Sequence, residues 1–178
     1  MWQKLTRCYP LQLELIPLVL LILAFYIVLS NYSLLPDSIP FHFDAQGNPD
    51  DWNSKETIFL LPSIAAVVFV LLTSFNVWFA CTNDPRRLIN LPEKRKEALT
   101  EAQAELLRLL IGRCLFILKI LILGLLTYLI WQTVEIAMGN ASRLGSLFWL
   151  LTAALVIFVV YMVWKSFRLT KAPGDVSG

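Results

Sequence analysis

Four long apolar stretches constrain this chain more than any other feature of its sequence. A transmembrane helix needs roughly 20 apolar residues, because the hydrocarbon core of a bilayer is about 30 Å thick. The stretches run from Leu11 to Leu29, from Ile58 to Ala80, from Leu109 to Trp131 and from Leu147 to Trp164. Hydrophobic residues make up 57% of the 178 residues, which exceeds the apolar share of ordinary soluble domains. The sequence therefore predicts an all-α integral membrane protein with four transmembrane helices.

The basic residues predict how these helices are oriented. Lys and Arg are enriched in cytoplasmic loops, so their distribution among the short connections reports the topology. One side of the predicted membrane carries Lys55 and Arg143. The other side carries most of the basic residues, namely Lys4, Arg7, Arg86, Arg87, Lys94, Arg95, Lys96, Arg108, Lys165, Arg168 and Lys171. We therefore predict a multi-pass protein of the cell membrane with both termini in the cytoplasm.

This topology divides the chain into four parts. Residues 1–81 form a membrane unit of two helices, with an extracytoplasmic loop at 33–56 between them. Residues 82–108 form a cytoplasmic loop and an amphipathic helix, residues 109–164 form the third and fourth transmembrane helices, and residues 165–178 form a cytoplasmic tail. The lipid bilayer is the partner that this composition predicts, whereas a net charge of +2 gives no reason to expect direct binding of nucleic acid.

The extracytoplasmic loop is the most distinctive polar segment of the chain. From Leu35 to Lys55 it reads LPDSIPFHFDAQGNPDDWNSK, and it contains the single histidine of the sequence. Apolar and polar residues alternate before a turn-forming segment, so we expect a β-hairpin or an Ω-loop with one face toward the helices or the lipid. We expect Phe41, Phe43 and Trp52 to pack toward the helices or the lipid interface, and His42, Asp44 and either Asp50 or Asp51 to face outward.

This loop is also the candidate surface for a ligand or partner, through His42, Phe43, Asp44, Gly47, Pro49, Asp50, Trp52 and Lys55. One imidazole and several carboxylates within ten residues are able to bind a divalent cation or to transfer a proton. The same residues are ordinary in turns, and we favour this structural interpretation because Gly47 is misplaced for a calcium-binding loop. We predict no metal site and no cofactor. No nucleophile motif or phosphate-binding motif is present, so we also expect no catalytic residues.

Two basic residues, Arg113 and Lys119, interrupt the third apolar stretch. A basic side chain near the centre of a bilayer costs about 2.5–3.5 kcal/mol on insertion scales. We expect the Arg113 side chain to reach the inner membrane surface, whereas Lys119, which lies deeper, reaches it only in part. Glu14 lies at about the depth of Arg113, and Thr73, Ser74 and Asn76 lie at depths that the Lys119 ammonium group can reach. We therefore predict an intramembrane polar cluster, with Glu14, Asn76, Arg113 and Lys119 as its candidate residues. The cluster forms either part of an ion or proton path or an interhelical salt bridge. We favour the salt bridge, because residues 121–126 add no titratable group.

An acidic stripe marks the predicted cytoplasmic helix. Glutamates recur every fourth residue at Glu93, Glu97, Glu101 and Glu105, and apolar residues recur at helical spacing beside them. We expect one helix to carry all four glutamates and to run without a break into the third transmembrane helix. The stripe is either a docking face for a cytosolic partner or another subunit, or a solvated face balanced by nearby basic residues. We favour the solvated face.

A motif in the extracytoplasmic loop resembles a known family. It reads LPxxIPxHF from Leu35 to Phe43 and GxPDxWxSK from Gly47 to Lys55, between two hydrophobic helices. At these positions the chain is similar to the domain of unknown function that opens the bacterial SdpI-like membrane proteins. The resemblance covers about Leu11 to Ala80. It implies a role in immunity to secreted peptide toxins, or in signalling through a membrane-sequestered repressor.

Two functions follow from the residues and the resemblance. In the first, the chain is an SdpI-like immunity or sensing protein, whose outer loop meets a secreted peptide and whose cytoplasmic helix reports to a soluble regulator. In the second, it is an accessory or scaffold subunit of a larger membrane complex or transporter, with other membrane subunits as partners. Neither function is enzymatic. Substitution of Lys119 separates them, because a transport path through Lys119 would lose flux.

Overall fold

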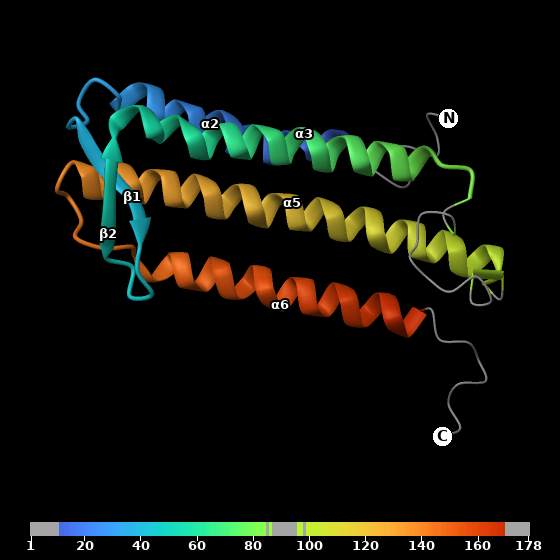
Figure 1. Cartoon of the computed structure of the whole chain (residues 1–178). Helices are drawn as coiled ribbons and strands as arrows, with labels where there is room; N and C mark the ends of the chain where they lie inside the picture. Colours follow the sequence, from blue (N-terminus) through green and yellow to red (C-terminus); the bar gives the residue numbers. More distant parts are fainter. Residues whose placement is uncertain (1–10, 85, 87–95, 98, 170–178) are drawn as a thin grey trace.

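The computed structural model describes residues 11–84, 86, 96–97 and 99–169. Long helices lie side by side, and a two-stranded hairpin packs across one end of them (Figure 1). The elements in chain order are the 3-10 helix η1 (Leu11–Glu14), the helix α2 (Leu15–Asn31), the strands β1 (Ser38–Phe43) and β2 (Pro49–Ser54), the 3-10 helix η2 (Lys55–Phe59), and the helices α3 (Leu60–Cys81), α5 (Glu101–Ala137) and α6 (Ser146–Leu169). The described part of the chain is therefore mostly helical.

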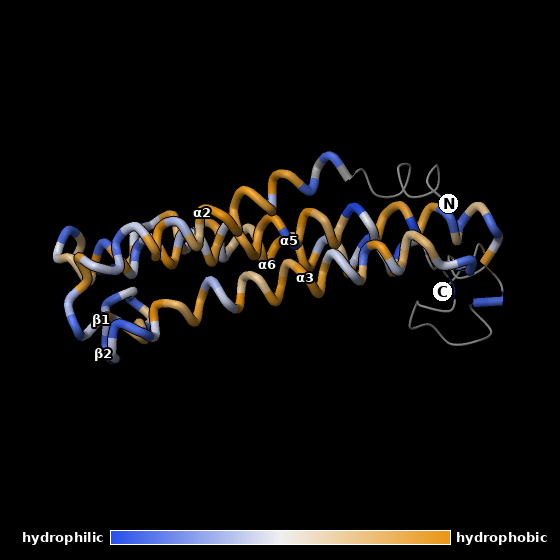
Figure 2. Tube along the Cα trace, turned by 90° about the horizontal axis from the view of Figure 1, so that it is seen from above, coloured by the Kyte–Doolittle hydropathy of each residue, from blue (hydrophilic) through white to orange (hydrophobic). Residues whose placement is uncertain are grey.

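Of the helices in the described residues, three are long and apolar enough to cross a membrane. They are α3 extended by η2, α5 and α6, while α2 is a shorter apolar helix of 17 residues. α5 has 37 residues, which corresponds to about 55 Å at 1.5 Å per residue and exceeds a hydrocarbon core of about 30 Å. Figure 2 shows apolar residues along most of the length of the helices. Length and composition therefore fit a helical membrane protein.

α5 is the central helix of the bundle. It packs extensively against α2, α3 and α6, whereas α2 and α3 contact each other less. Ile130 and Val134 of α5 belong to one buried cluster with Ala24 and Val28 of α2. The small Ala24 side chain allows the two helices to approach closely. α6 packs mainly along α5, and its apolar span has no buried residue.

The loop that the sequence predicts to be extracytoplasmic forms a β-hairpin in the structure. β1 and β2 pair antiparallel, with Ile39 opposite Asn53, and the register shifts after Pro40. Ile39 and Pro40 are buried, whereas Trp52 is 49% exposed. Of the two surroundings expected for Trp52, burial against the helices is therefore not seen, and contact with the lipid interface stays a prediction.

α5 begins at a break in the acidic stripe. Thr100 has an extended backbone, and its hydroxyl oxygen accepts a hydrogen bond from the N–H of Gln103. In turn, the side-chain oxygen of Gln103 accepts a hydrogen bond from the N–H of Thr100. This capping box starts the helix at Glu101. Glu97 lies before the break, so the expectation that one helix carries Glu97 together with Glu101 and Glu105 is wrong. Glu93 lies outside the described residues.

Candidate functional site

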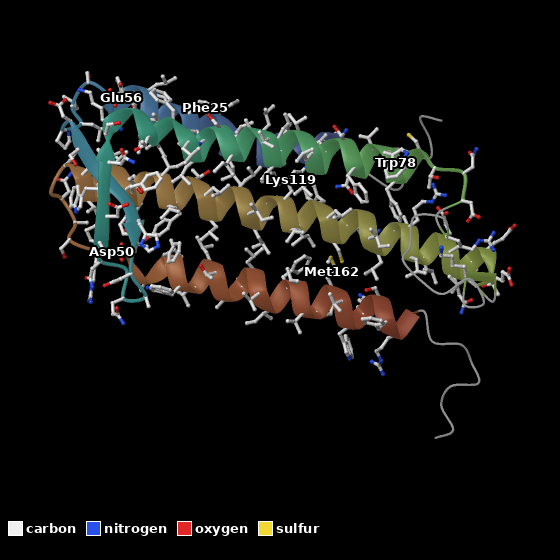
Figure 3. All side chains as sticks on the ribbon, viewed as in Figure 1. Phe25, Asp50, Glu56, Trp78, Lys119 and Met162 are labelled. Atoms are coloured by element: carbon white, nitrogen blue, oxygen red, sulfur yellow. The ribbon has the colours of Figure 1, made fainter. Side chains whose placement is uncertain are left out.

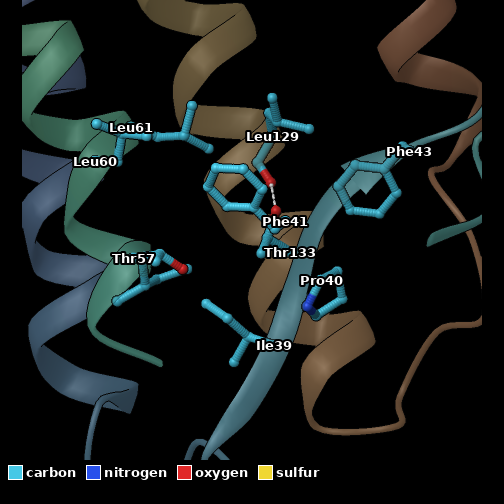
Figure 4. A pocket seen from close by; sticks show the side chains of 10 residues that line it. Ile39, Pro40, Phe41, Phe43, Thr57, Leu60, Leu61, Leu129 and Thr133 are labelled. Atoms are coloured by element: carbon cyan, nitrogen blue, oxygen red, sulfur yellow. Dashed lines mark hydrogen bonds between the residues drawn. The ribbon is translucent and has the colours of Figure 1, made fainter. Parts of the chain in front are cut away.

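An apolar cavity of about 130 Å³ lies where the hairpin meets η2, α3 and α5 (Figure 4). Segments far apart in the sequence line it, namely Ile39, Pro40, Phe41, Phe43, Thr57, Ile58, Leu60, Leu61, Leu129 and Thr133. An apolar cavity of roughly 150 Å³ accepts a molecule the size of benzene. The cavity is therefore large enough for one aromatic or branched aliphatic side chain.

The two hydroxyl groups in the cavity wall already donate hydrogen bonds. Thr133 Oγ1 donates to the carbonyl oxygen of Leu129 at 2.9 Å, which is the dashed line in Figure 4. Thr57 Oγ1 donates to the carbonyl oxygen of Ser54 at 2.7 Å. Both bonds are to nearby backbone of the same segment, so neither hydroxyl needs a polar partner in the cavity. The wall therefore favours an apolar occupant.

The tip of the hairpin rests on the loop between α5 and α6. The N–H of Leu144 donates to the carbonyl oxygen of Gly47 at 2.9 Å. Gly47 has a φ of +82°, and a Cβ atom added there would lie 3.1 Å from the Cβ of Leu144. Glycine is therefore required at this position by the backbone conformation and by the close approach of Leu144.

The base of the hairpin is closed by Lys55 and Asp37. Lys55 Nζ donates to the Asp37 carboxylate at 2.9 Å, and the Lys55 N–H donates to the Asp37 carbonyl oxygen at 3.0 Å. The Asp37 side chain is 98% exposed, so solvent screens the ion pair and the pair itself adds little to stability. With bonds at its base and at its tip, the hairpin is held over the cavity.

Asp44 organises the turn between the strands. Its carboxylate accepts hydrogen bonds from the side-chain amide of Asn48 at 3.0 Å, from the N–H of Asn48 at 2.8 Å and from the N–H of Gln46 at 2.9 Å. These bonds, led by the one from the Asn48 side chain, lower the pKa of Asp44 below its ordinary value. The carboxylate therefore has a structural use in the turn.

The other hairpin residues that the sequence singled out lie in different surroundings. Phe43 lines the apolar cavity, whereas Pro49 is half-buried in β2. His42 Nδ1 and Asp50 Oδ1 lie 2.6 Å apart, with side chains 67% and 46% exposed. Among the described residues, no group of three or more His, Cys, Asp and Glu side chains is placed to hold a metal ion. The structure thus joins His42 to Asp50 but does not gather the whole set into one site.

Lys119, which is labelled in Figure 3, is fully buried. It forms an ion pair with Glu14. Its Nζ donates to Glu14 Oε1 at 2.5 Å and to Thr73 Oγ1 at 2.9 Å, and Thr73 Oγ1 donates to Glu14 Oε2 at 3.3 Å. The rings of Phe69 and Phe116 lie 5.2 and 5.9 Å from the ammonium group. The three polar side chains come from η1, α3 and α5, so the cluster joins three elements of the bundle.

Arg113 and Asn76 do not join this cluster. Arg113 is exposed and lines a cleft between α5 and α6. Asn76 is buried, and neither polar atom of its side chain has a hydrogen-bond partner among the described residues. The prediction of one four-residue cluster is therefore corrected to Lys119, Glu14 and Thr73. Arg113 and Lys119 are six residues apart on one helix, so their side chains project about 120° from each other.

The end of the bundle away from the hairpin is polar. Arg108 is buried there, donates to the carbonyl oxygen of Ala80 at 2.8 Å, and lies 3.1 Å from the Glu105 carboxylate. Glu101 and Glu105 border a polar cavity of about 240 Å³ at this end. The structure therefore places these two residues of the acidic stripe at a surface next to the junction of α3 and α5.

Several residues of the cavity could not be found from the sequence alone. Ile39 lies inside the LPxxIPxHF motif, so a sequence pattern marks it. Leu129 and Thr133 are ordinary residues of an apolar stretch, and no pattern distinguishes them from their neighbours. Leu144 meets Gly47 only through the fold, so no local pattern marks it. The cavity itself depends on contacts between distant segments.

One comparison with known proteins matches the region around the hairpin, and another matches most of the chain. The family described as domain of unknown function (DUF1648) matches residues 19–66, which include the hairpin, η2 and the first turns of α3. An uncharacterized protein of Archaeoglobus fulgidus is 29% identical over 158 residues, which are 83% of this chain and 84% of that protein. No solved structure matches this chain. The matched domain thus supplies most of the walls of the apolar cavity, and α5 supplies the rest.

Proposed function

We propose that the chain is a four-span protein of the cell membrane, with the hairpin outside and both termini in the cytoplasm. η1 and α2 together cover residues 11–31 and provide the first span. Lys165 and Arg168 end α6, and Arg108 lies at the same end of the bundle, opposite the hairpin. This distribution of basic residues supports the orientation, because basic residues are enriched on the cytoplasmic side.

We further propose an immunity or sensing role of the SdpI-like type, in which the hairpin cavity receives an apolar side chain of a secreted peptide. The apolar cavity beneath the hairpin is the observation that carries this proposal. Its volume suits one large side chain, and its hydroxyl groups need no partner from an occupant. Phe41 is 45% exposed at the cavity wall, which leaves the cavity open to a peptide at the outer surface.

α5 offers a route by which an occupied cavity reports to the cytoplasm. Leu129 and Thr133 of α5 line the cavity, and the same helix continues without interruption to Glu105 and Glu101 at the other end. A continuous helix transmits a shift or rotation as one rigid element. A soluble regulator docked at the Glu101 end is the cytosolic partner in this proposal.

The test is purification in mild detergent from native membranes, followed by mass spectrometry of everything retained. A secreted peptide retained by the wild type, and lost when residues 44–51 are deleted, supports the proposal. The deletion variant must still insert in the membrane, which flotation with vesicles checks. Retention of no peptide by the wild type contradicts the proposal.

A second function, an accessory or scaffold subunit of a larger membrane complex or transporter, is favoured by one observation. α6 packs mainly on α5 and leaves large apolar side chains exposed, including Leu150 at 65%, Ile157 at 68% and Val160 at 63%. This face suits a neighbouring membrane subunit as well as lipid. Fixed stoichiometric membrane proteins in the same purification, with no peptide, support this second function.

A further inference from the structure

A second cleft, of about 390 Å³, lies between α5 and α6 in the half of the bundle away from the hairpin. Most of its wall is apolar, with Leu109 and Ile117 on α5 and Phe158 on α6. Two basic residues, Arg113 and Lys165, also line it. Among the described residues, no acidic side chain contributes to this wall. The cleft therefore combines an apolar surface with uncompensated positive charge.

Both cations have hydrogen-bonding capacity to offer an anion. Arg113 is exposed and makes no hydrogen bond or ion pair with any residue in the described ranges. Lys165 Nζ donates one hydrogen bond, to the Tyr161 hydroxyl at 2.8 Å, and an ammonium group has three donors. A guanidinium group binds phosphate through two parallel hydrogen bonds, and a lysine adds a point charge.

The depth of the two cations matches a lipid headgroup. Arg113 and Trp131 are 18 residues apart on α5, or about 27 Å at 1.5 Å per residue, close to the thickness of a hydrocarbon core. Trp131 lies toward the hairpin end and is 43% exposed. On α6, Lys165 follows Trp164, and tryptophans are enriched at the boundary between lipid tails and headgroups. Arg113 and Lys165 therefore lie at the boundary on the side away from the hairpin.

We propose that this cleft binds one anionic phospholipid, with its phosphate between Arg113 and Lys165 and an acyl chain along the apolar wall. Basic pockets between transmembrane helices on the cytoplasmic side are suited to anionic headgroups. The inference rests on the proposed membrane orientation and is independent of the peptide cavity, which lies at the other end of α5.

The test is native mass spectrometry of the purified protein with added phosphatidylglycerol or phosphatidylcholine of identical acyl chains. The wild type is expected to retain one phosphatidylglycerol in preference to phosphatidylcholine. Arg113→Gln is expected to lower that retention about fivefold, the contribution typical of one basic residue near an anionic membrane surface. The matched control is Arg168→Gln, because Arg168 lies on the same end of α6, stacks over Trp164 at 4.8 Å and does not line the cleft.

Three results would overturn the proposal. These are equal retention of the two lipids by the wild type, an equal loss in Arg113→Gln and Arg168→Gln, and displacement of the lipid by millimolar inorganic phosphate. Displacement would show that the cleft binds a soluble anion.

Arg113→Lys keeps the charge and is expected to retain most of the binding, while circular dichroism checks that each variant is folded. Retention of the secreted peptide by Arg113→Gln separates failure here from failure of the proposed function.

Discussion

The N–H of Leu144 donates a hydrogen bond to the carbonyl oxygen of Gly47, and this bond joins the tip of the hairpin to the loop between α5 and α6. The hairpin thus has a fixed position relative to the helix ends. Since β1 supplies one wall of the apolar cavity, the position of the tip also determines the shape of the cavity. The contact between Gly47 and Leu144 is therefore a structural requirement of the proposed peptide site.

Gly47→Ala is expected to lower the free energy of unfolding by about 2 kcal/mol or more. A left-handed backbone disfavours alanine by about 1–2 kcal/mol, and crowding against the Leu144 Cβ adds to this. Gly139→Ala is the matched control. Gly139 has a similar φ of +78°, but a Cβ atom added there would meet no other atom within 4 Å. Thermal unfolding in detergent should show a larger loss for Gly47→Ala. Equal losses would mean that the contact with Leu144 is unimportant.

Lys119→Met is expected to destabilise the protein by about 3–5 kcal/mol, because it leaves the Glu14 carboxylate in a largely buried position without its cation. The double variant Lys119→Met with Glu14→Gln removes both charges and should recover most of that stability. Unfolding of both variants in mixed micelles measures the difference. If the single and double variants are equally unstable, the ion pair is not the source of the effect.

Acid is expected to open the turn of the hairpin. The folded pKa of Asp44 is lowered by its hydrogen bonds, so its contribution is fully present above the unfolded pKa of about 4 and is lost as the pH falls through the folded pKa. Hydrogen exchange at the N–H groups of Gln46 and Asn48, corrected for the intrinsic rate, should therefore accelerate only below about pH 4. Asp44→Asn should remove this dependence. If hydrogen exchange depended on pH in the same way in the wild type and in Asp44→Asn, the Asp44 carboxylate would not be the group that holds the turn.

Filling the cavity is expected to block the peptide without unfolding the protein. Leu129→Trp places a larger side chain in the cavity wall, whereas Leu125→Trp lies one turn away on α5 and outside the wall. Overpacking destabilises by about 1–3 kcal/mol in either place, so stability alone does not distinguish the two. The amount of secreted peptide that co-purifies should fall for Leu129→Trp and not for Leu125→Trp. Equal recovery from both variants would place the peptide elsewhere.

The sequence predicts long helices better than it predicts their ends. The stretches that begin at Ile58 and Leu147 start within two residues of α3 and α6, because long apolar composition is a strong local signal. For the third long helix, we expect one that already includes Glu93, whereas α5 begins at Glu101, at a capping box of Thr100 and Gln103 that the sequence contains. The regular spacing of the glutamates favours a single continuous helix and gives no sign of this break.

Partners across the bundle were harder to predict than helices. Depth along the membrane placed Glu14 level with Arg113, but in the structure Glu14 pairs with Lys119. The depth of a residue does not say which neighbouring helix its side chain faces. That depends on how α5 packs against its neighbours. The apolar cavity was not predicted for the same reason, because its walls meet only through tertiary contacts.

The most direct test of the peptide site is photocrosslinking from the cavity wall in living cells. The photoreactive amino acid p-benzoylphenylalanine replaces Phe41, which lines the cavity, or Trp52, which is similarly exposed on β2 and does not line it. The account predicts a crosslinked secreted peptide from position 41 and little or none from position 52. Crosslinks from position 41 to lipid or membrane subunits alone, with no peptide, would contradict it.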